Sequence, residues 1–145
     1  MPQKESFYSV FDLRSITVKT ATFRKDVEIS DESNNIFFEV IAKHSYNFEK
    51  NLLRVEIGVV IEDSHLKEEY ARFEIWNLFK AENLNRFKIN DEEVQLPGEY
   101  QVTLNEIASS NVRGIVYQTL RKTKLKKLIL PLFEFHPKEE PSKLT

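Results

Sequence analysis

The sequence contains no cysteine, and this absence excludes disulfide bonds, thiolate zinc sites and thiol nucleophiles. Its 3 glycines are scattered, so it has no glycine-rich loop of the kind that binds phosphate groups. No apolar run approaches the length of a signal sequence or of a membrane-spanning helix. From these absences we expect a cytoplasmic protein that binds no nucleotide through a phosphate loop.

An excess of charge of one sign is also missing. Lys and Arg number 21 and Asp and Glu number 23, which gives a formal net charge of -2. This balance creates no global field that would attract nucleic acid or an anionic membrane. Hydrophobic residues make up 41% and charged residues 30% of the 145 positions, a composition that predicts one folded domain with a single core.

Residues suited to catalysis are few and far apart. His44, His65 and His136 fall in a predicted strand, a turn and the C-terminal tail, with no spacing that would bring two imidazoles to one metal ion. The carboxylates are spread over predicted solvent faces, where they form no acid and base pair. We therefore expect no enzymatic activity, no metal and no cofactor.

The sequence does contain long stretches in which apolar and polar residues alternate. This period of two predicts strands at 7–29, 36–48, 53–61 and 71–76, the first being either one long strand or two broken segments. Polar clusters at 31–35, 49–51 and 63–65 predict turns between them. Short connections predict an antiparallel meander, and its apolar face needs a cover.

A helix near the C-terminus is predicted to supply that cover. Thr103-Leu104-Asn105-Glu106 fits the capping box, in which the Thr and Glu side chains satisfy free backbone donors at a helix start. Apolar residues then recur at helical spacing, at positions 104, 107, 108, 112, 115 and 116. Gly114 follows a run of small residues at 108–110, so another backbone can approach closely, either the sheet or a helix of a second subunit.

A cluster of cations follows the predicted helix. It consists of Arg121, Lys122, Lys124, Lys126 and Lys127. Positive charge at a helix C-terminus is favoured by the helix dipole, by about 0.3–1 kcal/mol for each group, so the cluster needs no ligand. The alternatives are RNA, membrane lipid or an acidic protein partner. RNA would require aromatic residues between the lysines, and there are none.

Aromatic residues are more abundant than one sheet face requires. There are 11 Phe, 5 Tyr and 1 Trp. Strand parity places Phe37, Ile41 and Trp76 on the face opposite the predicted core, and Phe7 and Phe11 stand at the start of the first strand. Apolar residues on both faces indicate that the second face is also covered, by another subunit or by a transient partner.

The order of these elements resembles the SecB-like family of export chaperones. The resemblance rests on the start at 7–10 and 16–18, on strands at 35–48, 52–61 and 70–79, on a helix carrying 112–115, and on the closing Leu-Ile-Leu-Pro-Leu-Phe-Glu-Phe at 128–135. It defines a domain of residues 1–135. It implies an α+β subunit in which a four-stranded antiparallel β meander packs against one long C-terminal helix, assembled as a homodimer or homotetramer.

The function implied by the resemblance is that of an ATP-independent holdase that binds unfolded polypeptides in apolar grooves, with a possible role in protein export. For such a groove we nominate Phe7, Phe11, Phe37, Ile41 and Trp76 as client-binding residues. The partners would then be unfolded polypeptides and the export motor or one dedicated protein.

The sequence also departs from the family's export proteins. Its predicted surface strand positions mix Glu with Lys and Arg, whereas the export proteins carry an acidic surface that docks the motor. Residues 80–100 are too polar and too few for the family's first helix and crossover, and residues 136–145 are predicted to be a disordered tail. These departures leave room for two alternatives: a chaperone dedicated to one partner, such as an antitoxin, or an interaction subunit without chaperone activity. The basic run from Arg121 to Lys127 would then meet an acidic partner.

Overall fold

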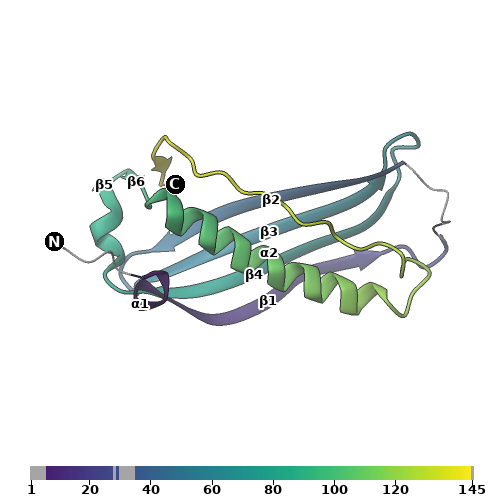
Figure 1. The fold of residues 1–145 in the computed structure, drawn as a ribbon, viewed down its shortest axis with the longest axis horizontal. Coiled ribbons are helices and arrows are strands. Elements are labelled where there is room, and N and C mark those ends of the chain that lie inside the picture. The colour runs from purple at the N-terminus through teal and green to yellow at the C-terminus, as the bar shows by residue number, and fades with distance from the viewer. Residues whose placement is uncertain (1–5, 28, 30–34, 145) are drawn as a thin grey trace.

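A four-stranded antiparallel sheet forms the centre of the fold (Figure 1). The structure is a computed structural model that describes residues 6–27, 29 and 35–144. The strands are β1 (Phe11–Phe23), β2 (Ile36–Asn47), β3 (Leu52–Asp63) and β4 (Glu69–Ala81), in the spatial order β1-β4-β3-β2. The predicted turn at 31–35 lies almost wholly outside the described residues. The α+β class and the antiparallel sheet of four strands are confirmed.

The strand order differs from a simple meander in one respect. Strands β2, β3 and β4 follow one another as predicted, but β1 pairs with β4 and not with β2. The connection from residue 24 to residue 35 is long enough to pass from one edge of the sheet to the other. As a result β1 and β2 form the two opposite edges of the sheet.

The central strands are buried on one face because their apolar residues alternate with polar ones. In β3, the buried positions are Leu53, Val55, Ile57, Val59 and Ile61, and each pairs with a buried position of β4. Val55, for example, is opposite Asn77, and Ile57 is opposite Ile75. We call this face the helix face and the opposite one the outer face.

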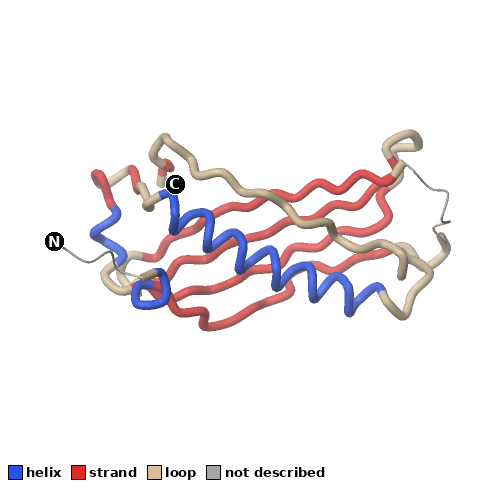
Figure 2. Tube along the Cα trace, viewed as in Figure 1, coloured by secondary structure: helices blue, strands red, loops and turns tan. Residues whose placement is uncertain are grey.

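The long helix α2 (Gly98–Leu120) lies across the helix face (Figure 2). It begins at Gly98, with Pro97 as its N-cap, so the predicted start at Thr103 is wrong. The Thr103 hydroxyl instead donates to the carbonyl oxygen of Glu99 at 2.8 Å, inside the helix. The apolar stripe begins one turn earlier than the capping-box pattern because the Tyr100 ring is buried against the core.

A second correction concerns the first residues of the predicted long strand. Phe7–Val10 form the short helix α1, in which Ser9 bonds to the Ser6 carbonyl through both its backbone N–H and its hydroxyl. This turn brings Phe7 against Phe11, with ring centroids 5.1 Å apart. The edge-to-face contacts of these two rings with Tyr100 of α2 outweigh the alternating pattern.

Residues 80–100, which the sequence leaves as a polar connection, form η1 (Leu84–Phe87), β5 (Lys88–Asn90) and β6 (Glu93–Val94). Strand β6 also pairs with β7 (Ser142–Lys143), so the chain end belongs to a second, three-stranded sheet. Between α2 and β7 the chain runs back beside the helix in an extended course (Figure 1). Residues 136–144, predicted as a disordered tail, are therefore placed against the domain.

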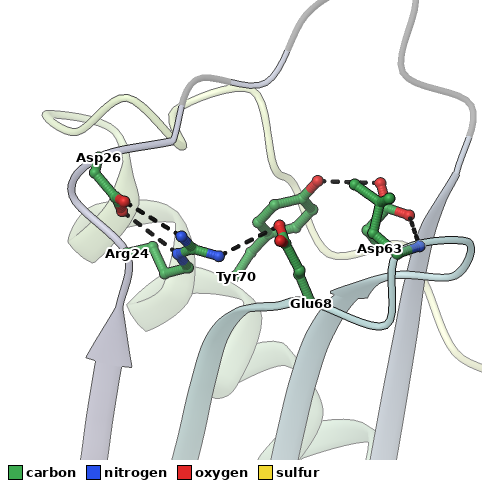
Figure 3. Close-up of polar contacts among 6 residues, drawn as sticks. Arg24, Asp26, Asp63, Glu68 and Tyr70 are labelled. Atoms are coloured by element: carbon green, nitrogen blue, oxygen red, sulfur yellow. Dashed lines mark hydrogen bonds and ion pairs between the residues drawn. The ribbon is translucent and has the colours of Figure 1, made fainter.

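The end of the sheet at the β3–β4 turn is fixed by polar contacts (Figure 3). Asp63 accepts backbone hydrogen bonds from His65 and Leu66 at 2.9 and 2.8 Å, and a third from the Tyr70 hydroxyl at 3.2 Å. These bonds lower the pKa of the Asp63 carboxyl. Nearby, Arg24 bonds to Asp26 and to Glu68, which links the chain after β1 to the start of β4.

Candidate functional site

The outer face of the sheet carries a shallow hollow centred on Gly58. Gly58 is opposite Ile41 of β2 and Glu74 of β4, and no atom lies within 4 Å of the position that its Cβ would take. The hollow has a volume of about 460 Å³. Ile41, which lines the hollow, is 60% exposed, and Phe37, four residues earlier in β2, is 49% exposed. Two of the nominated residues thus lie free on this face.

Trp76 also lies on the outer face, but its ring is covered by cations. The Arg54 guanidinium carbon is 3.8 Å and the Lys19 ammonium 4.4 Å from the ring centroid. The indole N–H donates to Glu74 at 3.1 Å. A ligand could therefore reach the Trp76 ring only after the cations move.

Phe7 and Phe11 belong to the helix side of the molecule. Phe11 is 3% exposed, and its ring is 5.6 Å from that of Tyr100 and 6.3 Å from that of Phe87. Phe7 is half-buried above it. The five nominated residues are thus divided between the two sides of the sheet and do not form one surface.

An apolar strip on β1 was not expected from the sequence. Leu13, Ile16 and Val18 are 38%, 41% and 46% exposed, and all three are opposite helix-face residues of β4. A register shift between Leu13 and Ser15 brings Leu13 to the same face as Ile16 and Val18. Parity counting misses them because this bulge inverts the alternation. Strand β1 is an edge strand, so this strip ends at a free strand edge.

A second, larger hollow lies on the helix side, between β2, the start of α2 and the C-terminal segment. We call it the tail cleft; its volume is about 750 Å³. On its wall the His44 ring nitrogen Nε2 is 2.7 Å from Oδ1 of Asn105 in α2. Burial lowers the pKa of His44, the hydrogen bond with Asn105 opposes that shift, and the nearby Lys138 adds to it. Burial also raises the pKa of Tyr46, another lining residue, to about 12.

Two glutamine side chains at the tail cleft bind the main chain of the C-terminal segment. The backbone N–H of Lys138 donates to Gln101 Oε1 at 2.8 Å. The carbonyl oxygen of Lys138 accepts from Gln95 Nε2 at 3.0 Å and from Gln101 Nε2 at 3.4 Å. Gln101 also donates to the Leu96 carbonyl at 2.8 Å. No motif in the sequence marks these glutamines, because their role depends on a partner about 40 residues away in the chain.

The five cations predicted as a patch for an acidic partner lie in the turn after α2, and each is exposed. Leu125 stands between them and Leu128 directly follows Lys127; both leucines are buried, so the turn directs its apolar residues inward and its cations outward. Lys124 lies close enough to Asp26 to lower the pKa of that carboxyl, although the hydrogen bond from Arg24 has the larger effect.

Within residues 6–27, 29 and 35–144, no three His, Asp or Glu side chains gather where they could hold a metal ion. His44 and His136 both line the tail cleft, and His65 lies exposed in the β3–β4 turn. None of the helices in the described part of the chain combines the length and the apolar character needed to cross a membrane.

Comparison with known proteins gives a match in structure and none in sequence. No protein-family model matches the chain, and no curated protein matches it. Among solved structures, the chain is similar to a SecB-like chaperone of Mycobacterium tuberculosis, determined in complex with a ChAD peptide from the HigA1 antitoxin. The two are 14% identical, the TM-score is 0.61, and the match covers 88% of this chain and 93% of the other. The SecB-like fold that the order of elements predicts is confirmed.

Proposed function

We propose that this protein is an ATP-independent chaperone that holds non-native polypeptide. The observation that carries the proposal is the likeness to a SecB-like chaperone over 88% of the chain. Exposed apolar residues on both sides of the sheet support it, since binding of extended polypeptide through apolar contacts requires no catalytic residue. A cytoplasmic location, as the cysteine-free sequence predicts, is part of the proposal.

Within this function we favour one dedicated partner over general export clients. The similar chaperone was determined with a peptide from an antitoxin, and that peptide is a segment of one specific protein. The five exposed cations in the turn after α2, from Arg121 to Lys127, would suit an acidic segment of such a partner. The outer face mixes acidic with basic side chains: Glu39, Glu56 and Glu74 with Lys43, Arg54 and Arg72. It therefore differs from the acidic surface with which the export proteins dock the motor.

Self-association is the second part of the proposal. The strip formed by Leu13, Ile16 and Val18 is apolar, continuous along one face and adjacent to the free edge of β1. Two copies related by a twofold axis could bury this strip against itself and pair their edges. We therefore propose a homodimer, or a homotetramer built from it.

The competing function is that of an interaction subunit without chaperone activity, whose apolar surface is permanently buried in a complex. The experiment that separates the two is aggregation of a chemically unfolded protein, followed by light scattering, at increasing concentrations of the purified chain and without ATP. Suppression near stoichiometric concentrations supports the chaperone. A folded, monodisperse protein that leaves aggregation unchanged would refute it and favour the interaction subunit.

A further inference from the structure

The C-terminal segment is held to the domain in two different ways. Up to Leu130 it is anchored by apolar burial, since Leu125, Leu128 and Leu130 are 0%, 2% and 3% exposed. From His136 to Pro141 every side chain is exposed. We call residues 136–144 the tail. Its attachment depends on its main chain, through the glutamine contacts of Lys138, the pairing of β7 with β6, and a bond from the Leu144 N–H to the Glu92 carbonyl at 2.7 Å.

Recognition of this kind does not depend on the side chains of the bound segment. The Gln101 amide offers one acceptor and one donor to the N–H and C=O of a single residue, as a neighbouring strand would. Every extended polypeptide presents the same pair of groups at each residue other than proline. The Gln101 amide can therefore bind the main chain of a foreign peptide as well as that of the tail.

The tail cleft also contains a buried acceptor that the tail leaves unused. Gln95 Oε1 is buried and has no hydrogen-bond partner among the described residues. An unpaired buried acceptor is costly, and a peptide N–H entering the cleft would satisfy it. The edge strand β2 lines the same cleft and pairs, within the described chain, only with β3. Its free edge offers further main-chain groups to an extended peptide.

The tail is seated against a position that has no side chain. A Cβ atom placed on Gly98, the first residue of α2, would lie 2.9 Å from Cβ and 3.3 Å from Cγ of Pro137. The first of these distances is shorter than real Cβ contacts, so any larger residue at 98 would push Pro137 away. Gly114, in the same helix, has no atom within 4 Å of its Cβ position. Gly98→Ala should therefore displace the tail, and Gly114→Ala, a matched change in the same helix, should leave it in place.

We propose that the tail, which forms one wall of the tail cleft, occupies the place that an extended client polypeptide takes, that the client displaces it, and that Gln101 binds the main chain of either one. This inference deepens the proposed chaperone function and rests on it. Displacement of the tail is then part of client binding, and the measured affinity is reduced by the fraction of molecules in which the tail holds that place.

The test compares Gly98→Ala, its control Gly114→Ala, and Gln101→Met with the natural chain. The probe is fluorescently labelled lactalbumin that has been reduced and carboxymethylated, so that it stays unfolded. Two quantities are measured: the dissociation constant of the probe, and the rate of tryptic cleavage after Lys138 and Lys143, which reports release of the tail. Circular dichroism and thermal unfolding confirm that each variant is folded. Ala is favoured over Gly in a helix, so both Gly variants should fold.

We expect Gly98→Ala to speed cleavage of the tail and to lower the dissociation constant about threefold to tenfold, because the competing occupant is removed. Gln101→Met should also speed cleavage, but its dissociation constant should lie about threefold to tenfold above that of Gly98→Ala, because both variants release the tail and only Gln101→Met also loses the main-chain contact with the client. Gly114→Ala should change neither quantity. If Gln101 held only the tail, Gly98→Ala and Gln101→Met would bind the probe equally well.

The outcomes separate this inference from the function on which it rests. Binding by the natural chain with an unchanged affinity in Gly98→Ala, despite a freed tail, overturns the inference alone. An unchanged cleavage rate in Gly98→Ala overturns it as well, because the tail would then not be seated as described. Absence of binding by every variant overturns both the inference and the chaperone function.

Discussion

Asn111 of α2 donates a hydrogen bond from its side-chain amide to Oδ1 of Asn77 in β4 across 2.9 Å, which joins the helix to the middle of the sheet. Asn77 is 0% exposed and is flanked by Val55 and Ile75. Polar pairs of this kind favour one helix position over others, because any slide of the helix leaves a buried amide without its partner.

This pair leads to a stability prediction. Asn111→Ala leaves the buried side-chain oxygen Oδ1 of Asn77 without its donor and should lower the free energy of unfolding by about 1–3 kcal/mol. Gln118→Ala, at an exposed position of the same helix, is the control and should change it by less than about 0.5 kcal/mol. Urea denaturation followed by circular dichroism measures both. Equal effects of the two substitutions would show that the hydrogen bond between Asn111 and Asn77 does not contribute to the free energy of unfolding.

A second prediction concerns pH. Burial holds the pKa of His44 below its ordinary value of 6.5, so the folded state disfavours the protonated ring. The stability contributed by neutral His44 is present above pH 6.5 and declines as the pH falls below that value. The urea midpoint should therefore drop between about pH 7.5 and about pH 5.5.

The drop should become smaller in His44→Gln, which cannot take up a proton. His65→Gln, in the exposed β3–β4 turn, is the control and should keep the drop of the natural chain. An identical decline in His44→Gln would assign the pH dependence to other groups.

A third prediction addresses the outer face. Changing Phe37 and Ile41 to Ser should leave the free energy of unfolding within about 1 kcal/mol of the natural value, because both side chains are largely exposed. It should raise the dissociation constant of an unfolded probe roughly tenfold if this face binds clients. Leu132→Ser, at a position that is 81% exposed on the C-terminal segment, is the control. Unchanged binding would remove Phe37 and Ile41 from the client surface, and unfolding would place them in the core.

A fourth prediction concerns self-association through β1. Ile16→Lys puts a charge into the apolar strip and should shift the mass in solution from an oligomer toward the single chain. Thr17→Lys puts the same charge on the other face of the same strand and should leave the mass unchanged. Light scattering coupled to size exclusion distinguishes them. An oligomer that survives Ile16→Lys, or a natural chain that is already monomeric, would contradict the proposed interface.

Local sequence patterns are sufficient to predict the buried face of the central strands but not that of β1. The alternation in β3 predicts its buried positions correctly, and the same parity places Phe37, Ile41 and Trp76 on the outer face. It fails in β1, where the bulge between Leu13 and Ser15 brings Leu13 and Ile16 to one face. The Thr103 to Glu106 pattern predicts an N-cap six residues after the observed one, Pro97, because the burial of Tyr100 extends the helix toward its N-terminus.

The class of fold follows from local sequence patterns, since the period of two and the helical stripe specify which faces must be buried, and burial of apolar surface dominates folding. These patterns also determine which outer-face residues are apolar. Only the tertiary structure decided that β1 lies beside β4, that Gln101 holds the main chain of Lys138, and that Gly98 makes room for Pro137. These relationships join residues that are distant in the chain, and their geometry exists only after the strands, the helix and the tail have packed together.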